Sequence, residues 1–150
     1  MTDQDQDFIK SLARQATARS PVPEQFKDCI NGTWKVVDGR VNVNGSVRLS
    51  ELNLTRIPIK FGTVSRDFSC SRNPLTSLEG APRSVGGDFY CQHTRLTSLE
   101  GAPMSVGGDF WCYDSPLTSL DGAPRSVGGT FVCNPGMPGL EEYNRRLRHA

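Results

Sequence analysis

Hydrophobic positions recur along most of this chain with a fixed period of 21 residues. The phrase Leu-Thr-Ser-Leu-Glu-Gly-Ala-Pro starts at Leu75 and at Leu96, and a copy with aspartate in place of glutamate starts at Leu117. A second phrase, Phe-x-Cys, has the same period, and its cysteines are Cys70, Cys91, Cys112 and Cys133. Such a period predicts a solenoid, in which each repeat is one coil that stacks on its neighbours.

Within one coil, Val85, Phe89 and Cys91 alternate with the polar or exposed positions Asp88 and Tyr90. This alternation predicts one strand from Val85 to Cys91 with a single buried face. Two leucines and Gly-Ala-Pro then supply the turn that reverses the chain. Alignment of the repeats extends the pattern back to residue 43, and the predicted coil starts are Val43, Val64, Val85, Val106 and, for a partial coil, Val127.

The two ends of the chain have a different pattern and predict caps for the solenoid. Acidic residues followed by Phe8, Ile9 and Leu12 predict a helix over residues 3–18, and a helical turn is expected from Glu24 to Cys29. Asp38-Gly39 predicts a hairpin between residues 34–37 and 41–43. The apolar stripe Leu140, Tyr143 and Leu147 predicts a C-terminal helix. We therefore expect one folding unit with an N-terminal cap over 1–42, a solenoid over 43–137 and a C-terminal cap over 138–150.

The five cysteines are interpreted as a reduced core ladder rather than as a disulfide or metal framework. Four of them occupy one repeat position, where stacked coils hold equivalent residues about 4.8 Å apart with side chains pointing the same way. The first coil has Leu49 at this position, and Cys29 lies outside the repeats. A disulfide or a metal site is the alternative, although zinc sites usually contain short-spaced cysteine pairs that this chain lacks.

Charge and composition limit the kind of partner and the cellular location that we expect. Seventeen basic against sixteen acidic side chains leave a formal charge of +1, which does not indicate a polyanion partner. The acidic, polar opening residues differ from a secretory signal, and no apolar stretch is long enough to cross a membrane. We expect a soluble protein of the cytoplasm.

The run from Phe68 to Leu78 reads Phe-x-Cys-x-x-Asn-x-Leu-x-x-Leu and resembles the core of the leucine-rich repeat. Its short period and trailing proline are similar to the compact repeats of bacterial secreted effectors. The fuller phrase, with Val-Gly-Gly-Asp-Phe-x-Cys, resembles small repeat proteins of tailed bacteriophages over about residues 34–137. The resemblance implies an α+β, mostly β solenoid with one parallel sheet, which binds proteins and interferes with host or defence machinery. Leucine-rich repeats carry an asparagine at the position of Asn73, but Thr94 and Ser115 replace it in the next two coils. A flatter β-solenoid is therefore the alternative geometry.

Differences between otherwise similar coils indicate which positions form a functional surface. They concentrate on and just after the Phe-x-Cys strand, where side chains alternate away from the core. Tyr90, Trp111 and Tyr113 form the candidate hot spot, and a row of three aspartates beside them favours a basic partner group. The predicted partner-binding face contains Arg48, Asp67, Arg72, Asp88, Tyr90, Gln92, His93, Asp109, Trp111 and Tyr113. The alternative is that these aromatic residues only stabilise the sheet by cross-strand packing.

No catalytic arrangement is predicted, since His93 is the only histidine in the repeats and the nearby Cys91 points inward. Phosphate-cradling and dinucleotide-binding fingerprints are missing as well, and no cofactor is expected. The expected function is non-enzymatic binding of another protein, with steric blockade of a host or defence protein as the mode implied by the phage resemblance. Single-stranded nucleic-acid binding and a structural role in a virion are the alternatives, and homo-oligomerisation stays open.

Overall fold

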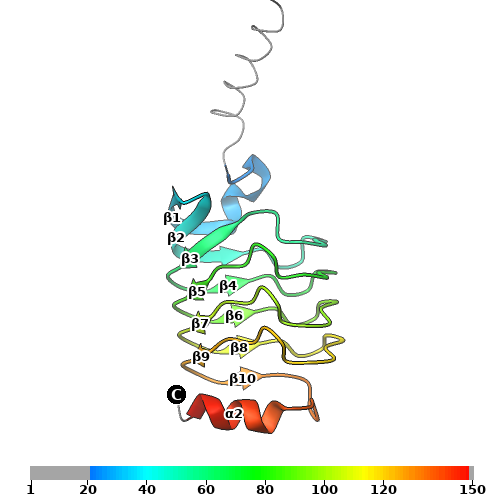
Figure 1. Ribbon diagram of the computed structural model, residues 1–150. Coiled ribbons are helices and arrows are strands. Elements are labelled where there is room, and N and C mark those ends of the chain that lie inside the picture. Colours follow the sequence, from blue (N-terminus) through cyan, green and yellow to red (C-terminus); the bar gives the residue numbers. More distant parts are fainter. Residues whose placement is uncertain (1–20, 149–150) are drawn as a thin grey trace, which may run out of the picture.

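The computed structural model describes residues 21–148, so the helix predicted over residues 3–18 lies outside the described part (Figure 1). The described part begins with a short 3-10 helix, η1 (Glu24–Cys29), followed by the strands β1 (Ile30–Val37) and β2 (Arg40–Arg48). Pairs of short strands follow, and the described part ends with helix α2 (Leu140–Arg148). The pairs are β3 (Phe61–Val64) and β4 (Phe68–Ser69), β5 (Ser84–Val85) and β6 (Phe89–Tyr90), β7 (Ser105–Val106) and β8 (Phe110–Trp111), and β9 (Ser126–Val127) and β10 (Phe131–Val132).

The fold is a parallel β-solenoid, and the predicted 21-residue coils are confirmed. The first strands of successive coils pair in register, so that Val43 aligns with Val64, and Val85 with Val106. The second strands form another parallel ladder, in the order β2, β4, β6, β8 and β10. Strand β2 is long enough to start both ladders, because its first half pairs with β3 and its second half with β4. Figure 1 shows the coils stacked between the N-terminal hairpin and α2.

The prediction of one continuous strand from Val85 to Cys91 is wrong, because a bend separates β5 from β6. The backbone N–H groups of Gly86 and Gly87 both donate to the preceding coil, to Val64 and Arg66. The N–H of Phe89 donates instead to Asp109 in the following coil. Successive N–H groups in a strand point in alternating directions, so two neighbours that point the same way interrupt it. The buried side chains of Val85, Phe89 and Cys91 nevertheless remain four and two residues apart, as the predicted alternation requires.

The core consists of ladders of identical side chains. Phe68, Phe89, Phe110 and Phe131 stack face to face, with neighbouring ring centroids 5.0–5.4 Å apart. Each of these rings is buried, and the valine and leucine ladders pack around them. An offset aromatic stack adds about 0.5–1.5 kcal/mol per pair to the gain from apolar burial. The repeated phenylalanine therefore holds each coil to the next.

The cysteines form the predicted ladder of free thiols. Cys70, Cys91 and Cys112 are buried in the core, Leu49 is buried at the equivalent position of the first coil, and all five thiols are free. Burial raises the pKa of the Cys70 and Cys91 thiols well above the ordinary value, which keeps them protonated. In the described part of the chain, no three metal-ligating side chains gather into a group.

The position of the repeat asparagine is filled differently in successive coils. Asn73 is buried and makes five hydrogen bonds to backbone groups: it accepts from the N–H groups of Leu52 and Leu54, and donates to the carbonyls of Leu49, Cys70 and Ser71. In the next two coils Thr94 and Ser115 hydrogen-bond to each other at 3.0 Å. In the last coil the equivalent residue is Gly136, and the contact comes instead from Asn134, two residues earlier, whose side chain donates to Ser115 O and accepts from Asp114 N–H. The polar contacts between coils are thus retained by different residue types.

The predicted hairpin and the predicted C-terminal helix are present within the described residues. Strands β1 and β2 form an antiparallel hairpin in which Val37 pairs with Arg40, and both turn residues, Asp38 and Gly39, have positive φ as a two-residue turn requires. At the other end, Tyr143 of α2 packs against Phe131 with ring centroids 4.6 Å apart and donates its hydroxyl to Pro124 O. In the described range no helix has the length and apolar character needed to span a bilayer.

Candidate protein-binding face

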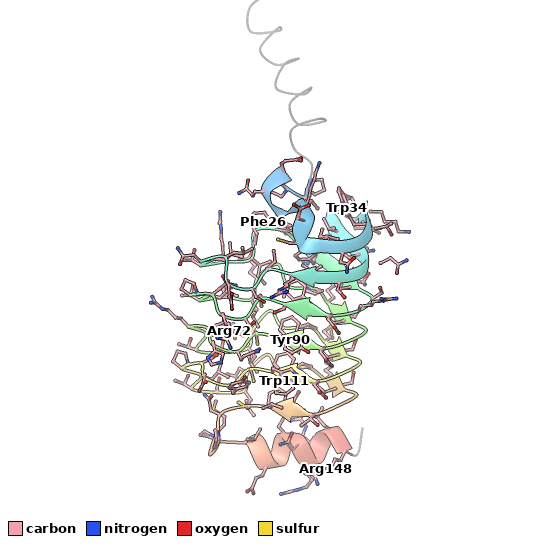
Figure 2. All side chains as sticks on the ribbon, turned by 180° about the vertical axis from the view of Figure 1, so that it is seen from behind. Phe26, Trp34, Arg72, Tyr90, Trp111 and Arg148 are labelled. Atoms are coloured by element: carbon pink, nitrogen blue, oxygen red, sulfur yellow. The ribbon has the colours of Figure 1, made fainter. Side chains whose placement is uncertain are left out.

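An aromatic cluster lies on the outer side of the second strand ladder. Tyr90 ends β6 and Trp111 ends β8, and because these strands pair in register the two rings stack with centroids 6.1 Å apart and an interplanar angle of 16°. Tyr113 packs edge-on against Trp111 at 6.1 Å, and His93 packs edge-on against Tyr113 at 5.2 Å. Figure 2 shows Tyr90 and Trp111 one above the other on this face, with Arg72 to one side. We call Tyr90, His93, Trp111 and Tyr113 the aromatic cluster.

The aromatic side chains are half-buried rather than fully exposed, which corrects the expectation that they point freely into solvent. Tyr90, Trp111 and Tyr113 all have intermediate exposure. Coils lie only about 4.8 Å apart, so large side chains at equivalent positions cover one another. Cross-strand packing, the alternative that the sequence offers, is therefore part of the role of these residues. A partner would contact the outer edges of the rings.

Two polar atoms in this region are buried without a hydrogen-bond partner among the described residues. They are Nε1 of Trp111, which can only donate, and Oε1 of Gln92, which can only accept. Leaving such an atom unsatisfied costs about 1–3 kcal/mol. Buried unsatisfied groups are rare in folded proteins, and both of these atoms belong to residues of the predicted partner-binding face.

The acidic row, which we define as Asp67, Asp88 and Asp109, ties neighbouring coils together. Oδ1 of Asp67 accepts a hydrogen bond from Asp88 N–H at 2.8 Å, and Oδ1 of Asp88 accepts from Asp109 N–H at 2.7 Å. Asp109 repeats the contact with Thr130 N–H at 2.7 Å. Each aspartate thus has a structural role in addition to the partner-binding role that the sequence predicts.

The acidic row also explains the second glycine of each Gly-Gly pair. A Cβ atom at Gly87 would overlap Oδ1 of Asp67, and one at Gly108 would overlap Oδ1 of Asp88. The glycine of one coil and the aspartate of the preceding coil therefore depend on each other. This dependence was not apparent from the sequence, where the glycines indicated only a crowded turn.

The acidic row affects the hydrogen bonding and the pKa of the Tyr90 phenol. The phenol of Tyr90 donates to Oδ2 of Asp88 at 2.9 Å. Burial, this hydrogen bond and the negative charges of Asp88, Asp67 and Asp109 raise the pKa of Tyr90 to about 12. The hydroxyl therefore stays protonated at neutral pH, and it holds the ring of Tyr90 beside the carboxylate.

A second row of residues lies two positions after Leu49 and after the equivalent cysteines of the following coils. Arg72 and His93 have left-handed backbone conformations, with φ of 55° and 56°, and so do Glu51 and Asp114 at the equivalent positions of the neighbouring coils. Arg72 Nε lies 3.7 Å from a Glu51 carboxylate oxygen, and His93 Nδ1 lies 3.3 Å from one of Asp114. Glu51 and Asp114 were missed as functional candidates. Each lies 21 residues from Arg72 or His93, and this pairing of an acidic with a basic residue type at one coil position was the signal that could have identified them.

Arg48 lies apart from the aromatic cluster. It occupies the same position as Tyr90 but two coils earlier, and the small Ser69 lies between them in the ladder. Ser69 belongs to a group of hydrogen-bonded serines with Ser50 and Ser71. The structure thus brings together Tyr90, Gln92, His93, Trp111 and Tyr113 with the acidic row, and it leaves Arg48 and Arg72 at the N-terminal end of the face.

The fold and this face define a capped parallel β-solenoid that carries an aromatic and acidic surface on one strand ladder. Comparison with known proteins adds no family, since no protein-family model, no curated protein and no solved structure matches the chain.

Proposed function

We propose that this protein is a non-enzymatic binding module that recognises another protein through the aromatic cluster. The observation that carries the proposal is the contiguous group of Tyr, Trp and His side chains, each partly exposed and packed against the next, on the outer side of one strand ladder. Tyr and Trp dominate the residues that contribute most to protein interfaces, because they bury much area with few rotatable bonds.

The shape of the solenoid supports a partner with an extended contact surface. The second strand ladder presents equivalent positions of successive coils side by side, and variation among those positions is what distinguishes one coil from the next. The leucine-rich-repeat resemblance favours the same class of partner. The resemblance to tailed-phage repeat proteins favours a bacterial host protein, which this solenoid would block by covering its surface.

Two observations weigh against single-stranded nucleic acid as the ligand. Tyr90 and Trp111 stack on each other, so one face of each ring is already occupied. Asp88 and Asp109 immediately precede the strands that carry Tyr90 and Trp111, and their carboxylates would repel phosphates there. An oligothymidine titration at low salt tests this alternative, and tight binding that weakens steeply with salt would favour it over a protein partner.

Replacing Trp111 with alanine is expected to weaken partner binding by about 2 kcal/mol or more, which corresponds to roughly thirtyfold. The phenylalanine core does not contact solvent at this position, so the variant should retain the fold with a modest loss of melting temperature. The measurement is affinity capture from bacterial lysate with the wild-type chain, identification of the retained protein, and titration of that purified protein against both forms.

Trp34 provides the matched control. It is the other tryptophan of the chain, it lies on β1 with 36% exposure, and its replacement by alanine removes the same side chain from a different surface. The Trp34→Ala variant should bind the captured protein as the wild type does. Equal affinity of the wild type and Trp111→Ala would contradict the proposed face.

A further inference from the structure

The carboxylates of the acidic row retain binding capacity after their structural contacts are made. Each of Asp67, Asp88 and Asp109 uses Oδ1 to accept a backbone N–H from the next coil. Oδ2 of Asp88 also accepts the phenol of Tyr90. For Asp67 and Asp109 the second oxygen has no hydrogen-bond partner within residues 21–148. A carboxylate offers about four lone-pair directions, so all three can accept further donors.

The negative charge of this row is not balanced by ion pairs. Among the described residues, ion pairs join Lys27 to Glu24 and Arg72 to Glu51, and His93 lies within salt-bridge distance of Asp114; none of these contacts includes the acidic row. The neighbouring cations Arg48 and Arg66 belong to the N-terminal end of the row, close to Asp67 in the chain or ladder. Uncompensated charge is therefore concentrated at Asp88 and Asp109.

These two carboxylates lie beside the aromatic cluster. Asp88 precedes Tyr90 by two residues, and Asp109 precedes Trp111 by two residues, with Phe89 and Phe110 turned into the core between them. A guanidinium group is planar, donates several hydrogen bonds in a fixed fork and packs well against aromatic rings. The rings of Tyr90 and Trp111, which are partly exposed and stacked on each other, supply the aromatic surface next to these carboxylates.

We infer that the partner presents an arginine-bearing basic segment, whose guanidinium group binds between the carboxylates of Asp88 and Asp109 and packs against Tyr90 and Trp111. This inference rests on the proposed function, because it specifies the chemistry of the partner at the same face. Carboxylates one coil apart, at about 4.8 Å, suit the forked donors of one guanidinium group better than the single ammonium group of lysine.

The test uses the full chain and a capped peptide of alternating arginine and glycine as the probe. Binding is followed through the indole N–H signal of Trp111 in heteronuclear NMR spectra, which a Trp34→Phe variant distinguishes from the signal of the other tryptophan. Peptides with lysine or glutamate in place of arginine are the matched probes. The arginine peptide should shift the Trp111 signal to saturation, the lysine peptide should bind more weakly, and the glutamate peptide should produce no shift.

The double variant Asp88→Asn/Asp109→Asn isolates the contribution of charge. An asparagine oxygen still accepts the N–H of the next coil, so the ladder is retained while two negative charges are removed. The control, Glu100→Gln/Asp121→Asn, removes the same charge from exposed turn residues of the same two coils. We expect the double variant to raise the dissociation constant for the arginine peptide about tenfold or more, and the control to change it less than about twofold.

Specific outcomes overturn the inference. It fails if the arginine peptide produces no shift at millimolar concentration, if lysine binds as well as arginine, or if the Asp88→Asn/Asp109→Asn variant binds like the wild type. The proposed function is tested separately, by the captured protein. If Trp111→Ala abolishes capture while Asp88→Asn/Asp109→Asn leaves it unchanged, the binding face stands and the arginine assignment falls.

Discussion

Replacing Asn73 with alanine is expected to lower the free energy of unfolding by about 3 kcal/mol or more, because five backbone groups lose a hydrogen-bond partner in the interior. The side chain is 2% exposed, and its contacts join the turn of one coil to that of the preceding one. A buried backbone group left unsatisfied costs about 1–3 kcal/mol, and water has little access to this site. Denaturant unfolding followed by circular dichroism measures the effect.

Thr94→Ala is the matched comparison, because Thr94 occupies the same coil position with fewer contacts. Its hydroxyl bonds only to Cys91 O, at 3.1 Å, and to the Ser115 hydroxyl, at 3.0 Å. Its loss should cost about 1–2 kcal/mol, clearly less than the loss of Asn73. If both variants lose the same stability, the hydrogen bonds of Asn73 are not what makes this position important.

Replacing Gly107 with alanine is expected to destabilise the solenoid by about 3 kcal/mol or more, or to prevent folding. A Cβ atom at this position would overlap the carbonyl oxygen of Gly86 in the preceding coil. The obstacle is backbone rather than the end of a flexible side chain, so the two coils must move apart. That movement would break the bond from Gly107 N–H to Val85 O and disturb the packing of the phenylalanine stack.

Gly136→Ala distinguishes steric overlap from the general effect of losing a glycine. A Cβ atom at Gly136 has no neighbour within 4 Å, but φ is +75°, so alanine there costs about 1 kcal/mol of backbone strain. Thermal and denaturant unfolding of both variants provide the comparison. A Gly107→Ala protein as stable as Gly136→Ala would show that the coils adjust to the added atom without separating.

The repeat pattern predicted the coil positions and the core because those features depend on side-chain type at a fixed spacing. The phenylalanine and the cysteine of the Phe-x-Cys phrase recur at the interval that one coil requires, and equivalent residues then stack in register. The hairpin turn at Asp38-Gly39 and the stripe of Leu140, Tyr143 and Leu147 were readable for the same reason: local conformation and burial depend on nearby residues.

The bend between paired strands was not predicted, because side-chain alternation is the same on both sides of it. What changes at Gly86 and Gly87 is the direction in which backbone N–H groups point, and no side-chain pattern records that direction. The candidate face was predicted by residue, but its contacts were not. Trp111 is half-buried because side chains of adjacent coils, such as Tyr90, pack against it, and these neighbours are 21 residues away in the sequence.

The sequence alone therefore determined that this protein is a stack of 21-residue coils and which positions of each coil face outward, since period and alternation are properties of the chain itself. Only the tertiary structure decided what the outward residues do to one another. Asp67, Asp88 and Asp109 support the next coil, Tyr90 donates to Asp88, and Trp111 retains an unsatisfied buried donor. These hydrogen bonds require donor and acceptor atoms about 3 Å apart, and the chain brings such atoms together only once the coils have packed.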